Sequence, residues 1–96
     1  MLNNPQKRHL KALAHARKAV LIVGANGLTP AVLGAIDEAL KHHELIKVKV
    51  NAEDRKARAA LIEHICNALD SELVQRVGHI ATLFRRNPAA PRLQLP

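Results

Sequence analysis

The sequence predicts an α/β fold: a single small domain with the order α-β-α-β-α-β-β, in which three helices pack on a four-stranded mixed sheet. Apolar residues recur at helical spacing in three segments, and they run continuously or alternate in four others. At 96 residues and 48% hydrophobic content, the chain has the length of one domain and enough apolar residues to fold it. We expect residues 1–86 to form this domain and residues 87–96, which contain three prolines, to form an irregular tail.

The first two predicted elements are a helix and a buried strand. Leu10, Leu13 and Ala14 share one side of a helix over residues 5–16, and basic side chains occupy its other side. The continuous apolar run 19–23 predicts a strand that is covered on both faces. The chain therefore enters the sheet soon after the first helix.

A glycine loop and a capped helix come next. Residues 24–27 read Gly-Ala-Asn-Gly, which predicts a loop. Thr29 can cap a following helix that has Pro30 at its first position, and the apolar face of this helix continues to about His43. Residues 45–50 predict a second strand. If this strand is parallel to the first, the two strands and the helix between them make a right-handed βαβ unit.

The second strand alternates, and a third helix follows it. One side of the strand carries Ile46, Val48 and Val50, and the other carries Leu45, Lys47 and Lys49. This pattern predicts a half-buried strand with a basic outer row. Asn51 followed three residues later by Asp54 is typical of a helix cap. The apolar side of the third helix is formed by Ala57, Leu61, Ile62, Ile65 and Leu69.

Two more strands complete the predicted sheet. Residues 72–77 and 79–86 are strand-like runs separated by Gly78, which indicates a hairpin. The hairpin adds an antiparallel part to the sheet. Phe84, at the end of this hairpin, is expected in the core or at the sheet edge.

The chain is strongly basic, which favours an anionic partner. It has 15 Lys and Arg against 8 Asp and Glu, a net charge of +7 and an isoelectric point near 10.4. The excess lies at the two ends, and residues 1–36 contain no acid. Nucleic acid, acidic lipid and acidic protein all fit this charge. Because Phe84 is the only aromatic residue, the sequence disfavours RNA modules that stack bases on several aromatic side chains.

The sequence indicates no membrane span, metal centre or catalytic centre. No segment approaches the roughly 20 apolar residues that cross a bilayer. The basic start resembles an organellar transit peptide, but it runs into the first strand. Cys66 has no second cysteine to pair with, which fits a reducing cytoplasm. The six histidines lack a convincing ligand spacing, and no nucleophile-base pair is recognisable. We therefore expect no metal, no cofactor and no enzymatic activity.

The Gly-Ala-Asn-Gly loop is the feature that suits an anionic ligand best. Two glycines three positions apart leave backbone amides uncovered by Cβ atoms, so a phosphodiester backbone can approach. The N-terminus of the next helix offers free N–H groups and a partial positive charge. Asn-Gly is also an ordinary turn dipeptide, so the motif by itself leaves a plain turn open. Neither a Walker-type lysine nor a third glycine accompanies the loop, which disfavours a nucleotide site.

The residues of the loop and the second strand together resemble the CRM domain, and most closely the stand-alone bacterial YhbY-like proteins. The likeness rests on residues 24–29, which read Gly-Ala-Asn-Gly-Leu-Thr, and on residues 43–50, which read His-Glu-Leu-Ile-Lys-Val-Lys-Val. It extends to Ala39-Leu40 and to residues 6–15, 75–78 and 83–86. The resemblance covers residues 5–86.

This resemblance implies an α/β RNA-binding fold similar to the C-terminal domain of a translation initiation factor, with the glycine loop against the RNA backbone. Bacterial CRM members are associated with precursors of the large ribosomal subunit, and plant relatives act in organellar intron splicing. Many CRM loops place Lys or Arg at the two variable positions, which are Ala25 and Asn26 here. The positive charge must then come from flanking residues.

We predict a cytoplasmic RNA-binding protein that acts in ribosome assembly, with the ribosomal RNA of the large-subunit precursor as its partner. The expected contacts are Gly24, Ala25, Asn26 and Gly27 in the loop and the cations Lys7, Arg8, Lys11, Lys18, Lys47, Lys49, Arg85 and Arg86. Other helix cations lie beside acids and are expected to be solvated: Lys41, Arg55, Lys56 and Arg58. Two alternatives stay open: an intron-splicing cofactor, and a basic module that binds a membrane surface or a protein.

Overall fold

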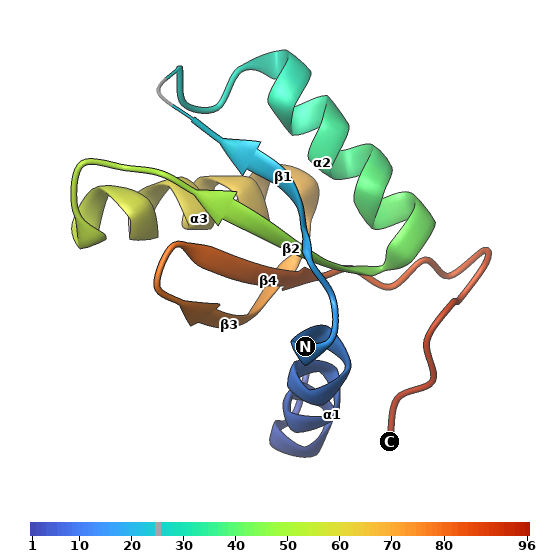
Figure 1. Cartoon of the computed structure of the whole chain (residues 1–96). Coiled ribbons are helices and arrows are strands. Elements are labelled where there is room, and N and C mark those ends of the chain that lie inside the picture. The colour runs from blue at the N-terminus through green and yellow to red at the C-terminus, as the bar shows by residue number, and fades with distance from the viewer. Residues whose placement is uncertain (25) are drawn as a thin grey trace.

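A computed structural model describes residues 1–24 and 26–96, and the elements follow the predicted order (Figure 1). They are α1 (Asn4–His15), β1 (Ala19–Val23), α2 (Pro30–His43), β2 (Leu45–Val50), α3 (Arg55–Leu69), β3 (Glu72–Val77) and β4 (Ile80–Phe84). The strands form one sheet in the order β1-β2-β4-β3. The predicted fold class, three helices on a four-stranded mixed sheet, is therefore confirmed.

The sheet is mixed because of how its strands are connected. β1 and β2 are parallel, with Val23 opposite Val50, and α2 makes the crossover between them. β4 is antiparallel to both of its neighbours, β2 and β3. As a result, the carboxyl ends of β1 and β2 and the turn between β3 and β4 all lie at the same end of the strands, which forms one edge of the sheet.

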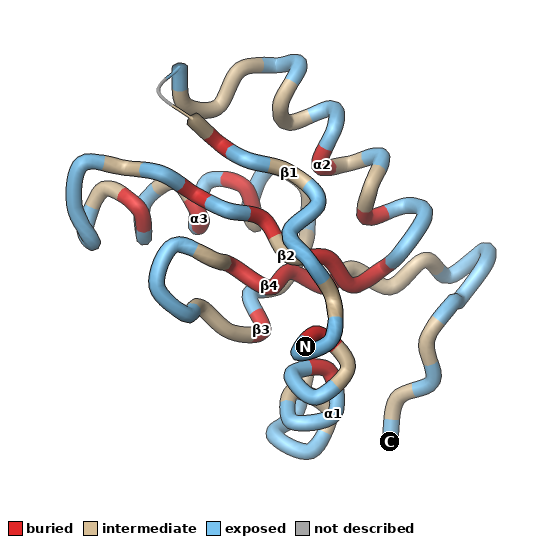
Figure 2. Tube along the Cα trace, viewed as in Figure 1, coloured by how far each residue is buried: buried red, intermediate tan, exposed pale blue. Residues whose placement is uncertain are grey.

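The main core lies between the sheet and the pair α2 and α3. Its buried residues are Val23, Ile36, Leu40, Ile46, Val48, Val50, Ile62, Ile65, Ala81 and Leu83. The alternation in β2 explains why every second residue of that strand contributes: Ile46, Val48 and Val50 all face this side. Figure 2 shows the buried residues concentrated along the two central strands. Cys66 is partly buried and packs against this core.

A second, smaller core lies on the opposite face, under α1. Leu10 and Ala14 of α1 pack there with Leu45, Val74 and Phe84. Phe84 is therefore a core residue, as predicted. This packing buries the apolar side of α1, and the polar side of the helix faces solvent.

One sequence expectation about β1 is wrong. The apolar run was expected to be covered on both faces, but Val20 is 50% and Ile22 61% exposed. β1 is an edge strand, and α2 and α3 cover only the face that carries Leu21 and Val23. A continuous apolar run predicts a strand, but it does not show whether one face or both faces of that strand are covered in the fold.

The helix starts follow from capping side chains, with one shift. The Thr29 hydroxyl accepts the N–H of Val32 at 3.1 Å, which confirms it as the cap of α2. The cap of α3 is Asp54, whose carboxylate accepts the N–H of Ala57 at 2.7 Å, and not Asn51 as expected. Both residue types cap helices well. Asn51 instead donates its backbone N–H to the carbonyl of Val23 at the end of β1.

A buried carboxylate fastens the C-terminal tail to the domain. Glu44 is 0% exposed, and its oxygens accept backbone N–H groups of Asn87 at 2.7 Å, Arg92 at 2.6 Å and Leu93 at 2.8 Å. Residues 87–96 form no helix or strand, but Leu93 packs against the second core. The tail is thus irregular in structure and held in place by hydrogen bonds.

The exposed glycine in α2 offers a direct test of helix stability. We expect Gly34→Ala to raise the free energy of unfolding by about 0.5–1 kcal/mol, because alanine loses less conformational entropy in a helix interior. An added Cβ at Gly34 meets no atom within 4 Å. Urea unfolding measures the change. Gly78→Ala is the matched control and should destabilise, since Gly78 has φ +58°. A Gly34→Ala protein no more stable than the original would contradict this prediction.

Candidate nucleic-acid interface

Three connections of the chain meet at the edge of the sheet, and we call them the loop edge: residues 24 and 26–29, residues 51–54, and residues 78–79. Two backbone hydrogen bonds hold them together. The N–H of Asn51 donates to the carbonyl of Val23 at 3.0 Å, and the N–H of Val50 donates to the carbonyl of His79 at 2.7 Å. The loop edge is visible at the left of Figure 1, where β1, β2 and the β3–β4 hairpin end.

A backbone hydrogen bond holds the two ends of the glycine loop together, and the space around both glycines is open. The N–H of Gly27 donates to the carbonyl of Gly24 at 3.0 Å. Gly27 has φ +68°, which favours glycine, and a Cβ built on either glycine meets no atom within 4 Å. Asn26 is exposed, and Ala25 lies outside the described residues. The two glycines therefore present bare backbone that a phosphodiester chain can approach.

The start of α2 adds less to this surface than the sequence suggests. Pro30 has no N–H, and the Thr29 hydroxyl already accepts the N–H of Val32. Two of the first-turn positions are therefore unable to donate to a ligand. The positive end of the helix dipole still lies beside the loop and favours an anion there.

The two strand lysines have different surroundings. Lys47 is half-buried and donates to the carbonyl of Arg17 at 3.0 Å, while Arg17 donates to the carbonyl of Leu45 at 2.6 Å. These bonds tie the α1–β1 connection to β2. Lys49 is exposed, lies opposite Ile22 of β1 close to the loop edge, and makes no side-chain hydrogen bond or ion pair among the described residues. Lys49 is thus the strand cation that is available to a ligand.

The basic residues of the N-terminal segment lie away from the glycine loop. Lys7, Arg8 and Lys11 are on α1, and Lys18 precedes β1, so β1 separates all four from the loop at its other end (Figure 1). Lys11 and Lys47 line a small groove between α1 and the sheet, with a volume of about 230 Å³. The structure therefore makes two basic regions from cations that the sequence treats as one set.

The two C-terminal arginines predicted as RNA contacts are engaged within the protein. Arg85 donates to the carboxylate of Asp37 at 2.7 Å and to the carbonyl of Leu69 at 3.0 Å. The hydrogen bond from Arg85 holds the pKa of Asp37 below its usual range, although desolvation acts in the opposite direction. Arg86 donates to the carbonyl of Leu93 at 2.6 Å and lies 5.7 Å from the centre of the Phe84 ring.

A buried arginine at the loop edge was not predicted. Arg58 was expected to be solvated, but it is only 8% exposed. Its Nε donates to the carbonyl of Val50 at 3.1 Å, and its Nη2 lies 3.3 Å from Nε2 of His79. No carboxylate lies within 4.0 Å of this guanidinium in residues 1–24 and 26–96. The buried charge of Arg58 thus has no ion-pair partner in the described residues, although the loop edge itself carries two acids, Glu53 and Asp54.

Three more residues connect the loop edge, and the sequence did not single them out as RNA contacts. Nδ1 of His79 lies 3.1 Å from Oδ1 of Asn51, and Arg76 donates to the carbonyl of Gly78 at 3.0 Å. The proximity of His79 and Asn51 depends on pairing between segments 28 positions apart, so no local pattern could have revealed it. The one sequence signal was the position of Asn51 directly after a strand.

The described part of the chain offers neither a metal site nor a thiol with a lowered pKa. In the described residues, no group of three or more His, Cys, Asp and Glu side chains is arranged to hold a metal ion. Burial raises the pKa of the Cys66 thiol, which disfavours the reactive thiolate. No helix in this part of the chain is long and apolar enough to cross a bilayer.

Fold and site together define a small basic α/β domain with an open glycine loop at one edge of its sheet. The sequence model of the CRS1/YhbY (CRM) domain matches residues 2–85. This protein belongs to the CRS1/YhbY (CRM) domain family, which confirms the resemblance predicted from the loop and the second strand.

Individual relatives match nearly the whole chain. A Haemophilus influenzae protein named RNA-binding protein is 45% identical over 95 residues, which are 99% of this chain and 95% of that one. A Pseudomonas aeruginosa relative is 45% identical over 87 residues, 91% of this chain and 84% of its own. The solution structure of a Staphylococcus aureus protein superposes with a TM-score of 0.85 at 33% identity, over 100% of both chains.

Proposed function

We propose that this protein binds RNA through the sugar-phosphate backbone and that the loop edge is its main contact surface. The observation that carries this proposal is the open backbone at Gly24 and Gly27, together with the exposed cation Lys49 opposite Ile22 on the neighbouring strand. The name of the Haemophilus influenzae relative supports RNA as the partner. Binding, and not catalysis, is the activity that such a surface provides.

The cations divide into two roles in this proposal. Lys49 and the buried charge of Arg58 act at the loop edge. The exposed cations Arg8, Lys11 and Lys18 form a second contact region at the far end of β1, so a folded RNA larger than a single strand would meet both. Lys47, Arg85 and Arg86 are also predicted contacts, but their hydrogen bonds within the protein favour a role in stabilising the fold.

We further propose that the RNA is the ribosomal RNA of a large-subunit precursor and that the protein acts in ribosome assembly in the cytoplasm. Membership of the CRM family supports this role, and an intron is the alternative RNA. The membrane-surface alternative loses its support because Leu10 and Ala14, on the apolar side of α1, are buried against the sheet. A helix that binds a lipid surface needs that side free.

Sequencing of RNA crosslinked to the protein in cells tests the biological role. Enrichment of large-subunit ribosomal RNA is the expected result. Enrichment of intron or messenger RNA in its place would overturn the ribosomal assignment and leave RNA binding intact.

The salt dependence of binding tests the phosphate mechanism. If about four phosphates are neutralised, the logarithm of the association constant should fall with the logarithm of salt concentration at a slope of roughly −3 to −4. Fluorescence anisotropy with a labelled fragment of large-subunit ribosomal RNA measures this slope. Lys49→Gln should make the slope shallower by about 0.7–0.9, the contribution of one phosphate.

Lys41→Gln is the control for that measurement. Lys41 is an exposed lysine at the end of α2, 3.5 Å from Asp37, and it lies away from the loop edge. Its replacement removes the same charge and should leave the slope unchanged. An affinity that does not depend on salt would refute the phosphate mechanism.

A further inference from the structure

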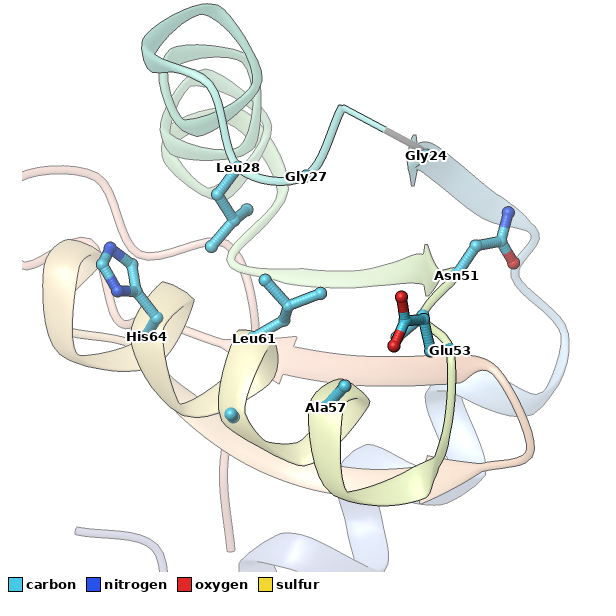
Figure 3. Close-up of a pocket in the computed structure, with 10 residues that line it drawn as sticks. Gly24, Gly27, Leu28, Asn51, Glu53, Ala57, Leu61 and His64 are labelled. Carbon is cyan, nitrogen blue, oxygen red and sulfur yellow. The ribbon is translucent and has the colours of Figure 1, made fainter.

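A cleft opens beside the glycine loop, between the start of α2 and one side of α3 (Figure 3). Its volume is about 1070 Å³, at the upper limit of the roughly 300–1,000 Å³ of small-molecule sites. Gly24 and Gly27 line one wall, and Ala57, Ala60 and Leu61 of α3 line the other. The same glycines therefore border both the proposed phosphate contact and the cleft.

The cleft shares Gly24, Gly27, Leu28 and residues 51–53 with the loop edge, but its lining is not basic. No Lys or Arg lines it among the described residues, and its one charged side chain is Glu53. A carboxylate repels a phosphate, so the RNA backbone has no reason to enter. The middle is apolar: Leu28 and Leu61 lie near each other there, as Figure 3 shows. The cleft therefore suits a group that is largely uncharged and apolar on its faces.

Polar groups stand at the two ends of this apolar middle. Figure 3 shows His64 at one end and Glu53, next to Asn51, at the other. An imidazole ring can stack on a base. The Glu53 carboxylate can accept hydrogen bonds and cannot donate them, so it pairs with an exocyclic amino group such as the N4 amine of cytosine. Uracil has no exocyclic amine, and its one ring donor, N3–H, lies between two carbonyl oxygens that a carboxylate would also face, so uracil should bind less favourably.

We propose that the cleft holds an unpaired RNA base with an exocyclic amino group, while the phosphate of the same strand lies on the glycine loop. This inference rests on the proposed function, since the backbone contact brings the base to the cleft. One base is read at this position through the carboxylate of Glu53, and the apolar surface of Leu28 and Leu61 covers its face. The protein would thus distinguish unpaired bases without a platform of aromatic side chains.

Single-stranded hexamers test the proposal: one of cytidines, one of uridines, and one of abasic ribose phosphates with the same charge. We expect the cytidine hexamer to bind about tenfold more tightly than the other two, the size of one good base contact. Glu53→Gln should reduce the preference for cytidine over uridine to about twofold or less, because a neutral amide can also donate to uracil. Equal affinity of the original protein for all three hexamers would overturn the base site.

A second experiment fills the cleft with a larger side chain and measures the affinity for the same hexamers. Ala60 is an exposed residue of α3 that lines the cleft, and Ala68 is an exposed residue of the same helix that does not. Ala60→Leu should lower affinity for the cytidine hexamer roughly tenfold and leave the abasic hexamer unchanged, whereas Ala68→Leu should affect neither. If Ala60→Leu changes neither affinity, the cleft does not hold the base. If no hexamer and no ribosomal RNA fragment binds the original protein, the proposed function itself fails.

Discussion

Replacing Gly24 with aspartate is expected to lower the affinity for RNA at least tenfold without unfolding the protein. A carboxylate about 4 Å from a phosphate costs roughly 1 kcal/mol in water and about 4 kcal/mol near a protein surface, before screening by salt. The side chain also occupies the space that the backbone of the RNA would enter. Because Gly24 has no positive φ and its Cβ direction is open, the free energy of unfolding should change by less than about 0.5 kcal/mol.

The control for this variant is Ala89→Asp. Ala89 is exposed in the C-terminal tail. Figure 1 shows this tail on the side of the molecule away from the loop edge. Ala89→Asp changes the net charge by the same amount, so a general loss of electrostatic attraction would appear in both variants. Anisotropy titrations and urea unfolding of the two proteins separate the effects. Equal RNA affinity of Gly24→Asp and Ala89→Asp would remove the loop from the interface.

The second large effect is expected at Glu44, where Glu44→Gln should lower the free energy of unfolding by about 2–4 kcal/mol. The carboxylate accepts the N–H groups of Asn87, Arg92 and Leu93 and lies within 3.4 Å of Arg86. An amide has one oxygen for these donors, and its NH₂ group would face one of them. The buried N–H group left without an acceptor accounts for the loss.

Glu38→Gln is the matched control, because Glu38 is an exposed carboxylate on α2 that pairs only with His42 in the described residues. Exposed pairs contribute little, so its change should stay below about 0.5 kcal/mol. Urea unfolding compares the two variants. Similar stability of Glu44→Gln and Glu38→Gln would show that the tail contacts do not stabilise the fold.

The pH dependence of the free energy of unfolding should also report the contribution of the Glu44 carboxylate. Burial acts to raise the pKa of Glu44, but the N–H groups of the tail and the charge of Arg86 outweigh it, and the pKa is lowered overall. A lowered pKa contributes stability above the unfolded value of about 4.3, and that stability is lost as pH falls through the folded value. Stability of the original protein should therefore fall below about pH 5, and that of Glu44→Gln should fall less steeply. The Asp37 pKa is lowered in both proteins, so the difference between the two curves reports Glu44.

Most of the fold could be predicted because its signals are local. The alternation in β2, the Thr29 cap and the glycines of the loop each depend on residues a few positions apart. The exposure of β1 could not be predicted in the same way. Val20 and Ile22 are apolar, and they face solvent because β1 is the outermost strand of the sheet and no helix of the described chain covers that face.

The candidate site was predictable only in its loop. Arg85 reads as a free cation in the sequence, but its acceptor Asp37 lies 48 positions away. Arg58 reads as solvated because acids flank it along the helix, but packing turns it toward Val50 and His79. Burial and partner choice for a charged side chain depend on segments that meet only in the folded state.

By itself, the sequence determined the element order, the glycine loop and the excess of positive charge, since each of these is a property of composition or of neighbouring residues. Only the tertiary structure decided which cations are available to a ligand and which stabilise the fold. It separated Lys49 from Lys47, Arg85 and Arg86, and it placed an apolar cleft beside the loop. The reason is that a hydrogen bond or a cleft requires two surfaces, and the packing of distant segments brings those surfaces together.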